Sequence, residues 1–218
     1  SIIAILAAML VPVLSRVKVK AQVKQAGIQI GQIVTAIHAY EAEYNRFPCS
    51  TNAMAVASAS REDFTYGTDF LKTCCPTITL APFYSSYVGR MDNSEVMAVL
   101  LDKETYPSDG THTINYGHVK NTKGTSFLNA TMVSDTKLGG IGPDLVYRDP
   151  WGNPYIISMD LNYNERTKDP FYRVANVSQK SGQNGINGLV NSTDSTGGSN
   201  DYECTAPVMV WSAGPDKK

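Results

Sequence analysis

The sequence has no excess of charge of either sign, because its 19 Lys and Arg residues face 20 Asp and Glu residues, for a net charge of -1. This balance gives no indication of nucleic-acid binding, for which clustered positive charge is typical. The length of 218 residues fits one domain, or one domain with an extended element. The hydrophobic content of 42% is enough for a packed core, but residues 1–45 differ in character from the rest.

Cysteine is scarce, and its spacing matches no common zinc site. Cys74 and Cys75 are adjacent rather than arranged as CxxC, and no histidine lies near enough in sequence to complete a ligand set. We expect two disulfides, because other features place the chain outside the cytosol; buried free thiols are the alternative. A bridge within the adjacent pair would be strained, so Cys49 and Cys204 are each expected to take one of that pair, in an order that stays open.

The sequence also lacks an apolar run long enough to span a membrane. Residues 1–14 carry no charge, but a membrane-spanning helix needs about 20 apolar residues. The chain has no initiator methionine, so we expect upstream residues, and about ten more apolar ones would complete such a helix. Pro12 would kink it or locally open its hydrogen bonds. A basic cluster follows, formed by Arg16, Lys18, Lys20 and Lys24.

What the sequence does contain is a long apolar stripe that predicts a helix. Its residues are spaced alternately four and three apart, and they are Val19, Val23, Ala26, Ile30, Ile33, Ile37, Tyr40 and Tyr44. Gly27 and Gly31 lie beside the stripe in a small-xxx-small pattern, which allows another backbone to approach closely. Pro48 disfavours helix at the residue before it, so we expect the helix to end near Asn45.

A helix from Ser1 to Tyr44 would be about 66 Å long, at 1.5 Å per residue. This is more than a compact domain of this size can cover, so one half must project. Residues 2–14 are apolar all round, which a monomer in water cannot accommodate; this half needs lipid or further copies of itself. The alternative is an amphipathic helix folded onto its own domain.

Three stretches together resemble the type IV pilins and the pseudopilins of type II secretion systems. The first is IIAILAAMLVP at residues 2–12 with the basic stretch after it, which is similar to the N-terminal helix of that family. The second is DPWGNPY at residues 149–155, which looks like a segment of the major pseudopilins. The third is the predicted strand VMVW at residues 208–211 with the following SAGPD, which is similar to their S-x-G-x-D loop. Residues 49–148 match no family segment.

The resemblance implies an α+β, pilin-like fold, in which the C-terminal half of the long helix packs on a small antiparallel sheet through the stripe residues named above. It also implies that a peptidase exposes and methylates the N-terminus of the mature chain. The part of the helix within residues 1–18 would first rest in the bacterial inner membrane. An ATP-driven assembly machine would then move it into the core of a filament. The filament-core residues would be Ile2, Ile3, Ile5, Leu6, Met9, Leu10, Pro12 and Leu14.

The head is expected to span residues 48–218, after a helix at residues 1–47. Asp149 and Pro150 suit the start of a turn, Gly152 accepts a positive φ, and Pro154 holds the preceding residue extended at the entry to a strand. Helices are predicted at Asn52–Phe64 and at Asp92–Glu104, the second with a capping box of Asp92 and Glu95. Strands are predicted at Thr113–Val119, Tyr155–Leu161, Phe171–Val177 and Pro207–Ser212, and a long surface loop at Gln179–Asp201.

No pattern indicates an enzyme. The three histidines, His38, His112 and His118, lie beside no nucleophile in the sequence. Because the resemblance implies calcium binding near the last strand, Asp216, Asp194 and Asp201 are candidate oxygen ligands, with a metal-free loop as the alternative.

The sequence therefore predicts a structural subunit of a helical filament, outside the cell or in the periplasm. A surface pilus and a secretion pseudopilus both remain open. The basic cluster could hold anionic lipid headgroups or pair with carboxylates of neighbouring subunits. The alternative function is a membrane-anchored surface binding or adhesion module that does not polymerise and uses the Gln179–Asp201 loop for contact.

Overall fold

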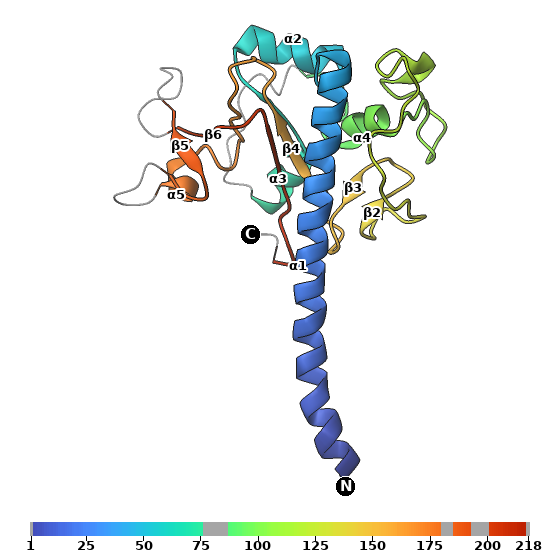
Figure 1. Cartoon of the computed structure of the whole chain (residues 1–218), viewed down its shortest axis with the longest axis vertical. Helices are drawn as coiled ribbons and strands as arrows, with labels where there is room; N and C mark the ends of the chain where they lie inside the picture. Colours follow the sequence, from blue (N-terminus) through green and yellow to red (C-terminus); the bar gives the residue numbers. More distant parts are fainter. Residues whose placement is uncertain (1, 76–86, 180–184, 193–200, 217–218) are drawn as a thin grey trace.

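The computed structural model of the chain describes residues 2–75, 87–179, 185–192 and 201–216, with side chains from Arg16 onward. It shows an α+β head on one long helix whose N-terminal part projects from the head (Figure 1). The helices are α1 (Ile2–Tyr44), α2 (Thr51–Ser60), α3 (Thr68–Cys74), α4 (Ser94–Leu100), α5 (Ala175–Ser178) and the 3-10 turn η2 (Tyr116–His118). The strands are β1 (Phe64–Tyr66), β2 (Gly140–Ile141), β3 (Tyr147–Arg148), β4 (Ile156–Met159), β5 (Leu189–Asn191), β6 (Tyr202–Cys204) and β7 (Val208–Trp211).

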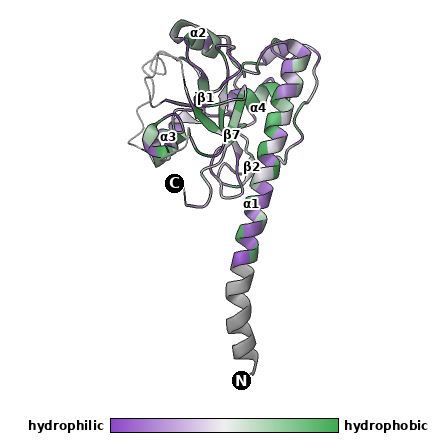
Figure 2. Ribbon diagram, turned by 60° about the vertical axis from the view of Figure 1, so that its left-hand side comes forward, coloured by the Kyte–Doolittle hydropathy of each residue, from purple (hydrophilic) through white to green (hydrophobic). Residues whose placement is uncertain are grey.

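The central sheet has the order β1-β4-β7 and is antiparallel throughout. Successive side chains of a strand point to opposite faces, and β4 follows this rule. Ile157 and Met159 belong to the main core, whereas Ile156 belongs to a second cluster with Leu71 and Trp211. Figure 2 shows the sheet between α3 on one side and α1 with α4 on the other. Strands β2-β3 and β5-β6 form two separate hairpin sheets.

The main core is built where α1 crosses the sheet. Ile33, Ile37 and Tyr40 of α1 are completely buried, and they belong to one cluster with Phe64 and Ile157. At about 25 cal/mol per Å² of apolar surface, burial of each large side chain stabilises the fold by roughly 2 kcal/mol. The predicted packing of the C-terminal half of the helix on a small antiparallel sheet is confirmed.

Two predicted strands are wrong, and both failures have local causes. In Thr113–Val119, Gly117 and His118 have φ of 67° and 56°, which an extended strand cannot contain, and the chain forms η2 instead. In Phe171–Val177, the carboxylate of Asp169 accepts the backbone N–H groups of Phe171 and Tyr172 at 2.9 and 3.1 Å. These bonds turn the chain, which then enters α5.

The predicted helices exist but are shorter than expected. Helix α2 ends where Arg61 adopts the left-handed conformation with φ of 55°, and α4 begins only at Ser94. The predicted capping box is wrong, because Glu95 turns inward. Its buried carboxylate accepts the hydroxyls of Tyr66 and Tyr87 at 3.0 and 2.6 Å. The predicted loop at Gln179–Asp201 contains β5, which pairs with β6; residues 180–184 and 193–200 of this loop lie outside the described residues.

Candidate functional site

The head holds only the C-terminal part of α1. Four stripe residues are buried and two are half-buried, namely Ala26, Ile33, Ile37 and Tyr40, and Ile30 and Tyr44. By contrast, Val19 and Val23 are 44% and 53% exposed, so the prediction that they pack on the head is wrong. The reason is that the head does not reach that far along the helix. The side chains of residues 2–14, the predicted filament-core residues, lie outside those that the structure describes, although their backbone is helical.

The DPWGNPY turn and the C-terminal loop meet at the point where α1 leaves the head. One oxygen of Asp149, Oδ1, accepts the backbone N–H groups of Trp151 and Asn153 at 2.9 and 2.8 Å. Its other oxygen, Oδ2, accepts the hydroxyl of Ser212 at 2.6 Å. Gly152 has a φ of 89°, as the turn requires.

Two further bonds complete this junction. Asn153 Nδ2 donates to the carbonyl of Gly214 at 2.7 Å, and Gln22 Nε2 of α1 donates to the carbonyl of Pro150 at 3.1 Å. The two motifs, about sixty residues apart in sequence, thus form one unit that fixes the exit angle of the helix. Its role is structural: it sets the direction in which the projecting part of α1 points.

The face of α1 that points away from the head carries a second stripe with the same spacing of four and three. All of its members are exposed, and they are Val17, Ala21, Lys24, Ile28, Gly31 and Thr35. Val17 and Ile28 are 58% and 64% exposed, which is unusual for large apolar side chains in a row. A Cβ added at Gly27 or Gly31 would meet nothing within 4 Å, so the backbone here is open to a partner. Sequence reasoning missed this stripe, although counting from Val17 in steps of four and three would have found it.

A groove runs between this face and the segment that contains Phe127. It has a volume of about 400 Å³, with Ile28, Gly31 and Thr35 of α1 on one wall and Phe127 and Leu128 on the other. A neighbouring polar hollow of about 310 Å³ lies at Gln29 and Gln32 and continues past residues 129–131. The exposed stripe and these hollows form one continuous surface suited to an elongated partner. Below it, the basic residues Arg16, Lys18, Lys20 and Lys24 are exposed and form no ion pair with any described residue.

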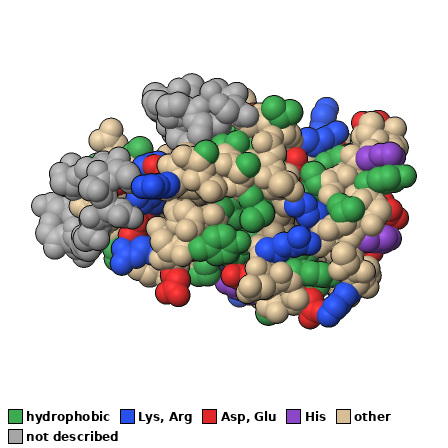
Figure 3. Space-filling model, turned by 90° about the horizontal axis from the view of Figure 1, so that it is seen from above, with side chains coloured by type: hydrophobic (Ala, Val, Ile, Leu, Met, Phe, Trp, Pro, Cys, Tyr) green, Lys and Arg blue, Asp and Glu red, His purple; other side chains and the backbone are tan. Residues whose placement is uncertain are grey.

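The histidines form no catalytic cluster within the described residues. His38 lies on the exposed side of α1 with Nδ1 3.2 Å from Glu41 Oε2. His112 stacks on Tyr116 with ring centroids 3.5 Å apart. His118 Nδ1 lies 2.8 Å from Asp102 Oδ1, and this hydrogen bond raises the pKa of His118. Figure 3, which looks down on the α2 end of the head, shows histidine side chains at one edge, beside carboxylates and apolar side chains.

All four cysteines are free thiols, which differs from the two disulfides that we predicted. Cys49 is buried in the main core, Cys74 packs against the second cluster, and Cys204 lies in β6. A disulfide needs Cα atoms within about 7 Å, and these three positions belong to different parts of the head. The Sγ atoms of Cys74 and Cys75 lie 3.3 Å apart at the end of α3. Burial raises the pKa of the Cys49 thiol to about 12, which leaves it unreactive.

The predicted calcium ligands do not come together. The carboxylate of Asp201 is taken by Arg173, whose Nε and Nη2 lie 2.8 and 3.0 Å from its two oxygens, and by Lys168 at 3.4 Å. Asp216 is exposed, and Asp194 lies outside the described residues. Among the residues that the structure describes, no group of three or more His, Cys, Asp or Glu side chains could hold a metal ion.

Within the described part of the chain, no helix combines the length and the apolar character that crossing a membrane requires. Comparison of the chain with protein-family models, with curated proteins and with solved structures yields no match.

Proposed function

We propose that this chain is the structural subunit of a helical filament with a pilin-like fold, and that identical copies assemble through α1. The observation that carries the proposal is the projecting part of α1, whose described side chains include exposed valines and an exposed isoleucine (Figure 1). Packing these side chains among further copies removes apolar surface from water. The heads then lie on the outside of the fibre, and the helices form its core.

The charge pattern supports head-to-helix contact between copies. The basic residues at positions 16–24 find no partner in their own head, whereas Glu41 and Glu165 are acidic side chains that line an open hollow on the head. In a filament such carboxylates can approach the basic cluster of a neighbour. Each exposed pair would add up to about 1 kcal/mol and, above all, select the register between copies.

The finer assignment follows the resemblance of the sequence. The DPWGNPY turn favours a pseudopilus of a type II secretion system, and the enlarged head favours a displayed pilus. Both assignments include the inner membrane as the location before assembly, an assembly machine as partner, and the periplasm or the cell exterior as the final location. No cofactor and no catalytic role are part of the proposal.

Deletion of residues 1–20 tests this function. The shortened chain keeps Gln22 and the whole buried part of α1, so we expect a folded head that stays monomeric. The intact chain, processed in its native host, should form ordered fibres visible by electron microscopy. Fibres from the shortened chain would contradict the proposal. Intact chain that stays in the membrane fraction without fibres would instead favour a membrane-anchored surface module, for which the unpaired basic residues supply a lipid contact.

A further inference from the structure

A hollow of about 550 Å³ lies between α2 and the loop that follows β4, at the end of the head opposite the N-terminus (Figure 1). Its size is within the range of small-molecule sites, which is about 300–1,000 Å³. In a fibre whose core is made of α1, this end of the head faces outward. The hollow belongs to none of the contacts that the proposed filament uses, so it requires a separate explanation.

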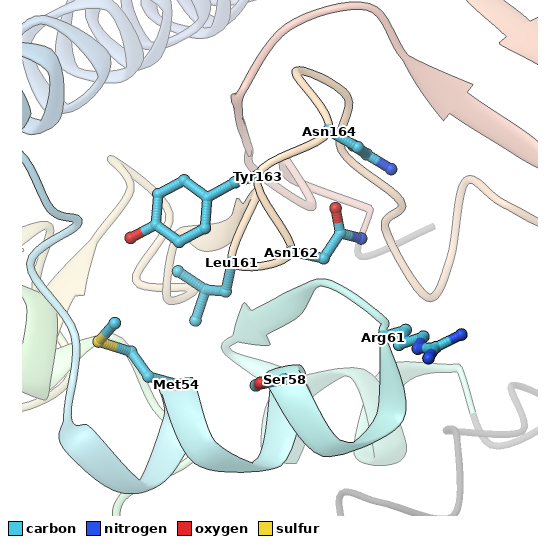
Figure 4. Close-up of a pocket in the computed structure, with 7 residues that line it drawn as sticks. All are labelled: Met54, Ser58, Arg61, Leu161, Asn162, Tyr163 and Asn164. Atoms are coloured by element: carbon cyan, nitrogen blue, oxygen red, sulfur yellow. The ribbon is translucent and has the colours of Figure 1, made fainter.

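Figure 4 shows that the hollow has an apolar end and a polar end. The ring of Tyr163 lies above Met54 at the apolar end. Asn162, Asn164 and Arg61 lie together at the opposite end. This combination of one aromatic face, two amides and a guanidinium suits a ligand with one apolar face and many hydroxyl groups.

The loop that carries these groups is fixed before any ligand binds. The buried carboxylate of Asp160 accepts the backbone N–H groups of Asn164 and Glu165 at 3.1 and 2.7 Å. Tyr163 is held in the left-handed conformation with φ of 60°, and yet its side chain is 55% exposed. A non-glycine residue in this conformation is strained, and such strain is concentrated at functional sites. Preorganisation of this kind lowers the entropic cost of binding.

Two polar groups of the hollow lack partners within the described residues. The Oδ1 atom of Asn162 is buried and accepts no hydrogen bond there, which costs roughly 1–3 kcal/mol. The guanidinium of Arg61 forms no ion pair with any described side chain. A hydroxyl group of a ligand would satisfy Asn162, and a carboxylate of the same ligand would pair with Arg61.

Tyr163 also forms a wall of a second hollow, of about 480 Å³, on the other side of its loop. Glu41, Glu165 and Thr205 line that hollow, so both sides of the loop offer hydrogen-bonding groups. A chain of sugar rings, unlike a compact aromatic molecule, could extend from one hollow into the other.

We propose that this hollow binds an acidic saccharide, with a pyranose ring stacked on Tyr163, hydroxyl groups bonded by Asn162 and Asn164, and a uronate carboxylate at Arg61. Because the hollow is open to solvent, a monosaccharide should bind weakly, with Kd of about 1 mM. An exposed ion pair of at most about 1 kcal/mol makes the uronate about threefold tighter than its neutral counterpart.

Saturation-transfer NMR on the full chain tests the proposal with three probes: methyl β-D-glucuronide, methyl β-D-glucoside and N-acetylglycine. We expect both sugars to bind, the glucuronide about threefold more tightly, and N-acetylglycine not to compete with them. Tyr163→Asn removes the ring but tolerates the left-handed backbone, and it should abolish binding of both sugars. Arg61→Gln should leave the glucoside affinity unchanged and remove the preference for the glucuronide.

Tyr116→Ala is the matched control, because Tyr116 is the other half-exposed tyrosine, at 49%, and lies far from this loop in the fold, in η2. It should change neither affinity. The proposal is overturned if neither sugar receives saturation at about ten times the expected Kd, if Tyr163→Asn binds both sugars as before, or if N-acetylglycine competes as well as the glucuronide. None of these results bears on whether the chain forms fibres.

Discussion

The carboxyl group of Asp63 shows how a single buried residue makes the stability of the head depend on pH. One oxygen, Oδ2, accepts the backbone N–H of Lys168 at 2.7 Å, while Oδ1 is buried with no hydrogen-bond partner among the described residues. Burial raises the pKa of this carboxyl group from 3.8 to about 7, against the lowering effect of the Lys168 hydrogen bond. The folded state therefore holds a proton that the unfolded state has lost between these two values.

We predict that the free energy of unfolding falls as the pH rises from 4 to 7, because the unfolded state binds fewer protons in this window. Between pH 5 and pH 7 the loss from Asp63 should be of the order of 2 kcal/mol. Asp63→Asn keeps an oxygen for Lys168 and cannot ionise, so it should flatten the curve. Urea unfolding at several pH values measures this, with the exposed Asp69→Asn as control. A curve for Asp63→Asn as steep as that of the wild type would contradict the assignment.

Asp149 is the second residue whose side chain determines structure beyond its own position. It accepts two backbone N–H groups of its turn and the hydroxyl of Ser212, so Asp149→Ala leaves three donors without their acceptor. We expect a loss of about 3 kcal/mol in the free energy of unfolding, since hydrogen bonds to charged groups contribute about 1.5–3 kcal/mol each and are partly replaced by water. Ser212→Ala removes one of these bonds and should cost about 1 kcal/mol. Equal losses for the two variants, measured by urea unfolding, would show that Asp149 does not hold the junction.

At the scale of the element, α1 has two apolar faces with different roles. One face is buried against the sheet from Ala26 onward, and the other, from Val17 to Thr35, is exposed. A helix that served only its own head would need one stripe. The open backbone at Gly27 and Gly31 is costly in a helix, where glycine is less stable than alanine by about 1 kcal/mol, so these glycines are best explained by a partner.

Gly31→Ala separates these two roles of the helix. Because an added Cβ meets no atom within 4 Å, the head should become more stable by roughly 0.5–1 kcal/mol. The same methyl group would keep a neighbouring helix at a distance and weaken assembly. Urea unfolding of the chain without residues 1–20 measures the first effect, and sedimentation of the intact chain measures the second. If assembly is unchanged while stability rises, this part of α1 is not an interface.

The elements also differ in how far the sequence determines them. The long helix was predictable because its spacing repeats locally over many turns, and β4 and β7 because each is a short apolar run next to turn residues. The strands β1, β2 and β5 were not predicted, since each has only two or three residues and exists through a distant partner. Strand β1, for example, pairs with β4 more than ninety residues away. The candidate sites divide in the same way: the helix stripe could be counted, whereas the hollow at Tyr163 depends on a loop held by Asp160.

At the scale of the whole molecule, a rigid head is attached to a helix that extends beyond it (Figure 2). The junction of the DPWGNPY turn with the C-terminal loop sets the exit angle, and the outward end of the head carries α2 and the Tyr163 hollow. This arrangement separates assembly at one end from ligand contact at the other.

The most direct test of the account is electron microscopy of the intact, natively processed chain carrying Ile28→Asp, beside the control Ala55→Asp. Ile28 lies in the centre of the exposed stripe, and Ala55 is an exposed alanine on α2 that contributes to neither surface. Both changes place a carboxylate on an exposed helix face, so circular dichroism should show an unchanged head in each. The account predicts ordered fibres for Ala55→Asp and none for Ile28→Asp. Fibres of normal length and order from Ile28→Asp would contradict it.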